Sequence, residues 1–316
     1  MVKAGRKSPK IRLIVTIFFL MIVFPVCPAF SQVLTIEPDQ QFAFAQHLYQ
    51  NGQYRRAAEE YQRFAFFFPQ DSRGRGALYL AADAYFNSRE FDIAIEILKD
   101  LSRKTPLDTV AVKAFFLMAE CYLQMGTPSQ AMVQLHNLTA LSDDPDVHDR
   151  AYFRMGWIYI EQMDWKAAQH AFSRIRAESP LPASELSAAL NQSTTIPQKS
   201  PALAGTLSIV PGAGQLYCGR YQDALAAFLV NVGLVWAAVD AFDQEQYALG
   251  GLLTFVGAGF YTGNIYSAVS SAHKYNLHRK QQFIDRLKHN PDIGLRVSSL
   301  GTPGGTALCL TLNVHF

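Results

Sequence analysis

The sequence predicts an all-α protein. Its expected parts are a solenoid of four 37-residue helical hairpins, a helical membrane hairpin and a short C-terminal β-hairpin. Three observations predict this architecture. Small and apolar residues recur every 37 residues between positions 42 and 180. Two long apolar stretches follow between positions 224 and 268, and apolar and polar side chains alternate over residues 307–316.

The repeat is seen as columns of residues that share a type and lie 37 positions apart. Two small-residue columns are Ala45, Ala82, Ala119, Gly156 and Ala57, Ala94, Ala131, Ala168. Within each unit the apolar residues lie three and four apart, and Asn51-Gly52-Gln53 is a turn signal between two such runs. Each unit is therefore predicted to be helix–turn–helix. Since one helix pair cannot bury both its faces, the pairs are expected to stack.

These residues resemble the tetratricopeptide repeats. That pattern has a small residue in the first helix, an aromatic residue near the turn, an alanine in the second helix and a proline after it. The first unit matches with Ala45, Leu48, Gly52, Tyr54, Ala57, Tyr61 and Pro69. The third unit departs from it, because Pro128 replaces the turn aromatic, and the 37-residue step exceeds the usual 34. The resemblance implies a binding scaffold and does not identify the partner.

By analogy with that family, the first helix of each unit would line a groove that suits an extended peptide. Amides in this groove would bind the peptide backbone and aromatic rings its side chains. The expected groove residues are Phe42, Gln46, Tyr49, Gln50, Tyr79, Asp83, Phe86, Asn87, Phe116, Glu120, Gln124, Phe153, Trp157 and Glu161. The alternative is that the aromatic column, Phe42 to Phe153, is core packing between units.

Residues 1–31 have the pattern of a secretory signal: a basic start, the apolar run Leu13–Phe24 and the small-x-small site Ala29-Phe30-Ser31. The alternative is an uncleaved anchor, which would place the repeats on the same side. Export predicts a solenoid (32–180) in the periplasm of a Gram-negative envelope, anchored in the inner membrane in preference to the outer one. The cysteines, Cys27, Cys121, Cys218 and Cys309, indicate no disulfide framework.

A linker (181–200) and a membrane domain (201–272) are expected next. Ala224–Val239 and Tyr247–Ala268 approach the roughly 20 residues of a spanning helix, so they are expected to form an antiparallel hairpin. Gly259 and Gly263 would allow close helix packing, within the hairpin in preference to a dimer. Basic residues follow the hairpin and favour a cytoplasmic tail, so an exported solenoid requires a third crossing at Pro201–Tyr217, unless that segment is re-entrant.

The start of the membrane domain also resembles a bacterial membrane-domain family of unknown function. Its signature is Pro-Gly-x-Gly-Gln-x-Tyr-x-Gly-x-Tyr, and residues 211–221 match it from Pro211 to Tyr221. Ala224 departs from the family, which has a glycine there. The last segment, 273–316, is expected to be a basic helix followed by a β-hairpin of Gly294–Leu300 and Ala307–Phe316.

The sequence shows no catalytic grouping, so we expect neither an enzyme nor a metal or other cofactor. The eight histidines are scattered, and the acidic run Asp143–Asp146 is expected to cap the next helix. A net charge of +2 gives no basic field for nucleic acid. The main hypothesis is a membrane-tethered scaffold for another envelope protein or peptide, in contact with lipid and open to homo-oligomer formation. The alternative is a transport or channel component with Asn231 and Asp240 lining a path.

Overall fold

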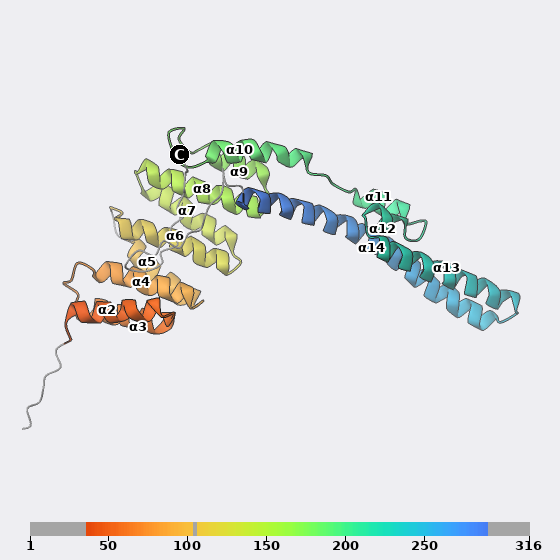
Figure 1. The fold of residues 1–316 in the computed structure, drawn as a ribbon, viewed down its shortest axis with the longest axis horizontal. Helices are drawn as coiled ribbons and strands as arrows, with labels where there is room; N and C mark the ends of the chain where they lie inside the picture. Colours follow the sequence, from red (N-terminus) through yellow and green to blue (C-terminus); the bar gives the residue numbers. More distant parts are fainter. Residues whose placement is uncertain (1–35, 104–105, 290–316) are drawn as a thin grey trace, which may run out of the picture.

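The computed structural model describes residues 36–103 and 106–289, and the regular structure in these residues is entirely helical. Figure 1 shows two parts: a stack of helix pairs and a long helical hairpin that projects away from it. The expected signal sequence (1–31) and the expected β-hairpin near the C-terminus lie outside the described residues. The predicted helical solenoid is confirmed.

The solenoid consists of four antiparallel helix pairs, one for each 37-residue unit of the sequence. The pairs are α2 (Pro38–Gln50) with α3 (Tyr54–Phe67), α4 (Gly74–Asn87) with α5 (Phe91–Ser102), α6 (Thr109–Gln124) with α7 (Pro128–Leu141), and α8 (Pro145–Glu161) with α9 (Trp165–Phe172). Each pair packs against the next in chain order (Figure 1). Stacking therefore buries the apolar face that a single pair would leave exposed.

The small-residue columns lie where helices approach most closely. Ala57, Ala94, Ala131 and Ala168, one in each second helix, are all completely buried. The first-helix column ends in Gly156, where an added Cβ would lie 2.3 Å from the ring of Phe172. That large ring leaves no room for the alanine that the other three units carry. The change from alanine to glycine in the fourth unit is thus a packing requirement.

The turn inside each unit has one conformation, set by a residue with positive φ. Gly52, Arg89, Gly126 and Met163 occupy this position, at φ of 72°, 64°, 72° and 62°. In the first unit, the N–H of Gln53 donates to the Leu48 carbonyl at 2.9 Å and that of Gly52 to the Tyr49 carbonyl at 3.0 Å. The other three units make the equivalent pair of bonds. This is the Schellman motif, which satisfies the last carbonyls of the first helix.

Residues 181–200, which are expected from the sequence to form a linker, are largely helical. They contain α10 (Ala183–Asn191) and the short 3₁₀ helix η1 (Gln192–Thr195). Leu186 and Leu190, one turn apart, are buried in the same cluster as Phe172. The two prolines led to the prediction of a linker, but Pro182 is the N-cap of this helix and does not interrupt its hydrogen bonds. Helix α10 covers the exposed side of the last pair.

The second part contains α11 (Pro201–Leu207), α12 (Ala213–Tyr217), α13 (Tyr221–Asp243) and α14 (Tyr247–His289). The expected third crossing at Pro201–Tyr217 is not supported, because α11 and α12 have only seven and five residues. Both short helices pack against α14 near the base of the hairpin. Of the described helices, α13 is the one that is long and apolar enough to cross a membrane.

Small and polar residues form the interior of the hairpin, and apolar residues form its outer surface. Its contact seam carries Ala224, Asn231 and Ala238 on α13, seven residues apart, against buried Gly250 and Asn264 on α14. The outer surface of both helices is rich in exposed large side chains, including Leu229, Val235, Trp236, Leu252 and Phe255. This distribution inverts that of a water-soluble helix pair and matches membrane helices, which associate through small residues.

Of the glycines that the sequence offers for close packing, Gly250 and Gly257 face α13 closely, whereas the spaced pair Gly259 and Gly263 does not. An added Cβ at Gly250 would lie 2.8 Å from the Phe242 ring, and one at Gly257 would lie 3.8 Å from Leu234. At Gly259 and Gly263 an added Cβ would meet nothing within 4 Å. The prediction that Gly259 and Gly263 pack within the hairpin is therefore wrong: their four-residue spacing puts them on one face, and that face is open.

Helix α14 joins the two parts of the molecule. Its 43 residues form a single helix about 65 Å long, so the apolar arm and the basic helix expected after residue 272 are continuous. Its last turns return to the solenoid, where Phe283, Ile284 and Leu287 are buried against α8, α9 and α10 (Figure 1). The Phe283 ring meets the Trp165 ring edge-on at 5.6 Å between centroids.

The turn geometry generates a stability prediction. Arg89 and Met163 hold a left-handed conformation that glycine adopts freely, so Met163→Gly and Arg89→Gly should each stabilise the solenoid by about 0.5–1 kcal/mol. The matched changes Gly52→Ala and Gly126→Ala should destabilise it by a similar amount. Denaturant unfolding followed by circular dichroism measures both. Destabilisation by the glycine variants would show that the side chains at 89 and 163 contribute more than the strain costs.

Candidate functional site

The expected binding residues all lie on the first helices α2, α4, α6 and α8, and we call this set the inner face. Four of them, one per unit and at the ends of these helices, are exposed: Gln50, Asn87, Gln124 and Glu161. Phe42, Gln46, Tyr79, Phe116 and Glu120 are half-buried, whereas Tyr49, Asp83, Phe86, Phe153 and Trp157 are buried. The part of the inner face that a partner can touch is therefore mainly the polar row from Gln50 to Glu161.

The aromatic column packs between helices and is covered by cations. The Arg73 guanidinium lies 5.2 Å from the Phe42 ring centroid, the Lys113 ammonium 5.9 Å from Tyr79, and the Arg150 guanidinium 5.5 Å from Phe116. In the second and third units the cation comes from the first helix of the following unit. These contacts tie successive units together by cation–π attraction.

Phe153 completes the aromatic column without a cation. It is 2% exposed, and its ring centroid lies 5.8 Å from that of Phe172. It belongs to the apolar cluster that also receives the end of α14. In the fourth unit the column is thus part of the core, which leaves Phe42, Tyr79 and Phe116 as the half-buried members that a partner could reach.

A buried polar cluster connects the first two units. The Tyr49 hydroxyl donates a hydrogen bond to the Asp83 carboxylate, and the Asn87 side-chain amide donates to the Tyr49 oxygen at 3.0 Å and to the Asp83 carbonyl at 2.8 Å. Burial raises the pKa of Asp83 to about 6, against the opposing effect of the Tyr49 hydrogen bond. The Asp83 carboxyl therefore holds its proton to a higher pH than an exposed aspartate does.

Glu120 is engaged within the solenoid by Arg154 of the next unit. Two hydrogen bonds join them, at 2.6 Å and 2.7 Å, in the bidentate geometry of a guanidinium–carboxylate pair. In the fourth unit, Glu161 accepts a hydrogen bond from Lys288 of α14 at 2.9 Å. The carboxylates Glu120 and Glu161 thus hold neighbouring helices. Gln50, Asn87 and Gln124 are exposed on the first three units, and the side-chain N–H groups of Asn87 are also bonded to Tyr49 and Asp83.

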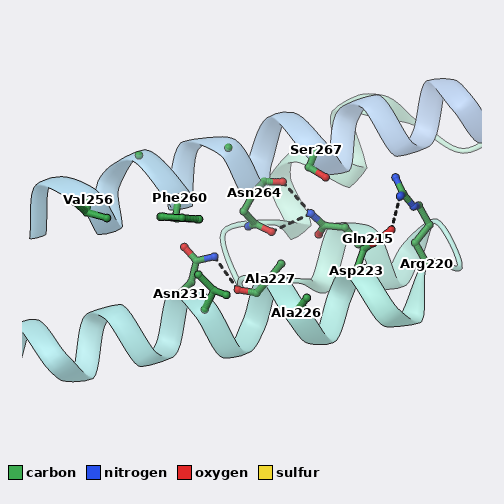
Figure 2. A pocket seen from close by; sticks show the side chains of 13 residues that line it. Gln215, Arg220, Asp223, Ala226, Ala227, Asn231, Val256, Phe260, Asn264 and Ser267 are labelled. Carbon is green, nitrogen blue, oxygen red and sulfur yellow. Dashed lines mark hydrogen bonds and ion pairs between the residues drawn. The ribbon is translucent and has the colours of Figure 1, made fainter. Parts of the chain in front are cut away.

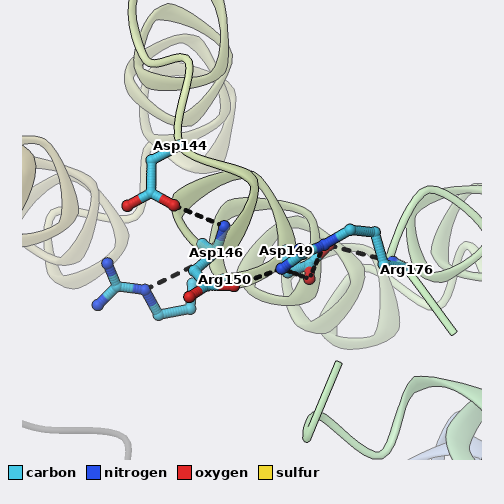
Figure 3. Close-up of polar contacts among 5 residues, drawn as sticks. All are labelled: Asp144, Asp146, Asp149, Arg150 and Arg176. Atoms are coloured by element: carbon cyan, nitrogen blue, oxygen red, sulfur yellow. Dashed lines mark hydrogen bonds and ion pairs between the residues drawn. The ribbon is translucent and has the colours of Figure 1, made fainter. Parts of the chain in front are cut away.

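The acidic run before α8 has a structural role, as the sequence predicted. The Asp144 carboxylate accepts a hydrogen bond from the backbone N–H of Asp146 at 2.9 Å and caps α8. Arg176, which follows α9, binds both Asp146 and Asp149 of α8 and so joins the end of the last unit to its first helix (Figure 3). In residues 36–103 and 106–289 no group of three or more histidine, cysteine or acidic side chains could hold a metal ion.

The Pro-Gly-x-Gly-Gln signature builds the base of the hairpin. Gly212 has φ of 87°, and an added Cβ would lie 2.3 Å from the Ala224 carbonyl oxygen. An added Cβ at Gly214 would lie 2.1 Å from the Ser208 hydroxyl oxygen and 2.6 Å from the Ala268 Cβ of α14. The Gln215 side-chain N–H donates at 3.0 Å both to the carbonyl oxygen and to the side-chain oxygen of Asn264 (Figure 2). Each of these signature residues therefore permits or makes a contact between α12 and the hairpin.

Asn264 is a central residue of the hairpin base that the sequence did not reveal. Its side-chain oxygen also accepts from the Gly212 N–H at 3.2 Å, and its amide donates to the Ser208 carbonyl at 3.1 Å. It lies 52 residues beyond Gly212, so only the folded hairpin brings the two together. The one available signal was a lone asparagine at the end of a long apolar stretch.

The family of tetratricopeptide repeats, described as "Tetratricopeptide repeat", matches the chain over residues 150–181. This segment covers most of the fourth unit, from within α8 to the loop before α10. No curated protein sequence matches the chain. The match and the four stacked helix pairs together support a tetratricopeptide-type interaction module.

The buried carboxyl of Asp83 generates a pH prediction. Its folded-state pKa of about 6 lies above the unfolded value of 3.8, so the folded state binds the proton more tightly. Between pH 4 and pH 6 this group therefore lowers the free energy of unfolding as pH rises, by up to about 2 kcal/mol. In Asp83→Asn this contribution is absent. The stability of the variant relative to the wild type should increase from pH 4 to pH 7, as measured by urea unfolding.

Proposed function

We propose that the protein is a membrane-tethered scaffold whose tetratricopeptide-type solenoid binds a segment of another envelope protein or peptide, and that it acts by binding and not by catalysis. The observation that carries this proposal is the exposed polar row on the first helices, Gln50, Asn87, Gln124 and Glu161, at one residue per unit. Amide side chains that repeat along a stack can bind the main chain of an extended peptide at successive positions.

Membrane attachment by the hairpin rests on its length and its outer surface. From Tyr221 to Asp240, α13 extends about 29 Å, close to the roughly 30 Å hydrocarbon thickness of a bilayer. Helix α14 packs along α13, so both arms enter the bilayer together. Exposed Tyr221 at the base and exposed Trp236 toward the tip lie near the two ends of the apolar stretch, where interfacial aromatic residues are common.

With both arms of the hairpin in the bilayer, the continuity of α14 relates the side of the solenoid to the side of its basic half. Two crossings return the chain to the side on which it entered, so the solenoid and the basic half of α14 share one side. The signal-like residues 1–31 favour the periplasm for that side, whereas the basic residues of α14 favour the cytoplasm. We propose the periplasm, because secretion of the N-terminal part precedes synthesis of the hairpin.

A role in transport is the second candidate. Its supporting observation is Asn231, a buried amide in the middle of α13. This amide donates to the Ala227 carbonyl at 2.7 Å within its own helix, and Asp240 lies at the exposed end near the tip. A transport path would therefore have to form between several copies of the hairpin. Solute flux through liposomes that contain the wild type but not Asn231→Leu would support this candidate over a pure tether.

Binding at the inner face is tested by photo-crosslinking in cells. A photoreactive residue at position 124, which is exposed in the centre of the row, should give a recurrent adduct with one envelope protein. The double variant Gln50→Ala with Asn87→Ala changes the two exposed amides of the first two units. It should reduce the adduct at 124 by about tenfold, since it removes two hydrogen-bonding side chains.

The matched control for this experiment places the same change on the opposite helices. Gln130 and Asn137 are exposed on α7, outside the inner face, and their replacement by alanine should leave the adduct unchanged. Thermal unfolding of both double variants is measured as well, because Asn87 also bonds Tyr49. Equal loss of the adduct in both would indicate general destabilisation. Adducts that form only within the chain would remove the support for a partner at this face.

The orientation is tested by labelling introduced cysteines in spheroplasts with a membrane-impermeant maleimide. Cysteines at exposed positions 124 and 282 should react, and one at exposed position 244, in the hairpin tip, should be protected. The reverse pattern would place the solenoid in the cytoplasm. Reaction at all three positions would show that the hairpin does not cross the membrane. Of the native cysteines, Cys121 and Cys218 are buried, and Cys27 and Cys309, which lie outside the described residues, are replaced by serine in every variant so that they cannot react.

A further inference from the structure

A groove of about 550 Å³ runs between α13 and α14 near the base of the hairpin, and the function proposed above gives it no role. Its inner end, toward the middle of the hairpin, is apolar and is lined by Val230, Val256 and Phe260. Its outer end, at the base, is polar and is lined by Gln215, Arg220 and Asp223 (Figure 2). The groove is therefore amphipathic along its length, and its polar end lies at the first turn of α13, where a membrane surface would be.

The charged end of the groove presents one cation and one anion side by side. Arg220 and Asp223 form an ion pair three residues apart, and both side chains are a little under half exposed. A second nitrogen of Arg220 donates to the Ser271 hydroxyl at 2.9 Å, which fixes the guanidinium against α14. A zwitterionic group that enters with its phosphate toward Arg220 and its ammonium toward Asp223 would match both charges.

Gln215 supplies a buried acceptor without a partner in the same place. Its residue is 1% exposed, and its side-chain N–H groups bond Asn264, but its side-chain oxygen has no hydrogen-bond partner among the described residues. Figure 2 shows this amide at the polar end, between the two helices. A buried carbonyl oxygen left without a donor costs free energy, so a ligand with an N–H or O–H group at this point would remove that cost.

Two glycines on α14 leave room in the groove, because they have no side chain. Gly259 and Gly263 both line it, and an added Cβ at either would meet nothing within 4 Å. From Asp223 to Val230 the groove follows α13 for about 10 Å, which accommodates the upper part of one acyl chain. Larger residues at 259 and 263 would project into this space, and their Cβ atoms would meet no atom of the hairpin.

We propose that this groove binds one phospholipid whose headgroup carries a primary ammonium, with the phosphate at Arg220, the ammonium between Asp223 and the Gln215 oxygen, and an acyl chain along Gly259 and Gly263. The proposal rests on the insertion of the hairpin in a membrane. A helix of a second copy is the less suitable occupant. The backbone N–H groups of a helix are already bonded within it, so they cannot supply the donor that Gln215 lacks.

The experiment measures lipid that stays bound to full-length protein. The chain is reconstituted in nanodiscs of equal phosphatidylethanolamine, phosphatidylcholine and phosphatidylglycerol, then released into detergent and analysed by native mass spectrometry. Wild-type protein should retain one phosphatidylethanolamine, in about tenfold preference over phosphatidylcholine, which has no N–H donor, and over phosphatidylglycerol, which has no cation. Asp223→Asn should reduce the preference over phosphatidylglycerol.

The double variant Gly259→Leu and Gly263→Leu fills the groove and should abolish retention. Its matched control is Gly251→Leu, which adds a leucine at another open position of the same helix outside the groove and should retain the lipid. Equal retention of all three lipids by the wild type, or retention by the filled variant, would overturn the proposal. So would a wild-type dimer that becomes monomeric on filling, because the occupant would then be a second copy. Failure to enter nanodiscs at all would instead count against the membrane function.

Discussion

The close approach of helices at small residues is the constraint on which both parts of the molecule depend. In the solenoid, fully buried alanines and Gly156 let the helices of each pair meet. In the hairpin, Ala224 and Ala238 of α13 lie at the contact between the two helices, and Gly250 and Gly257 of α14 keep that distance short. The two parts share the same kind of interior and differ in the exterior. Exposed large apolar side chains are scattered among polar ones on the solenoid, whereas they are concentrated along the hairpin.

The second constraint is the burial of the end of α14. Phe283, Ile284 and Leu287 complete the apolar cluster of the fourth unit together with α10. A solenoid must end in a helix that covers its last apolar face, and here a helix from the hairpin contributes to that cover. The fold of the last unit and the placement of the hairpin are therefore coupled. Loss of this contact would expose core residues as well as separate the two parts.

The sequence was sufficient for the features that repeat. Four copies of each column specified the helix pairs, the small contacts and the turn at Gly52, because periodicity reports which residues share a face. The cap by Asp144 was also predictable, since capping depends on a few adjacent residues. Helix α10 was missed because a nine-residue helix flanked by prolines has too few apolar positions to establish a period.

The candidate site was predictable only in part. A column on the first helix is found by its spacing, but spacing does not say whether a ring meets a partner or the next unit. Phe153 is buried against Phe172 of its own unit and Phe116 is half-buried beside Arg150 of the next, and both contacts arise only in three dimensions. The same reason explains Gly259 and Gly263: two glycines four apart identify a face, and only the position of α13 shows that this face is open.

The unbroken course of α14 has a consequence for which partners the scaffold could reach. From Ala272, at the end of the hairpin contact, to Phe283, in the solenoid, the helix rises about 16 Å. A helix resists compression and bending over this length, so it would set the height of the solenoid above the bilayer surface if the hairpin is inserted as proposed. With the hairpin embedded, a lipid-bound client would have to present its recognition segment at that height, whereas a soluble client meets no such limit.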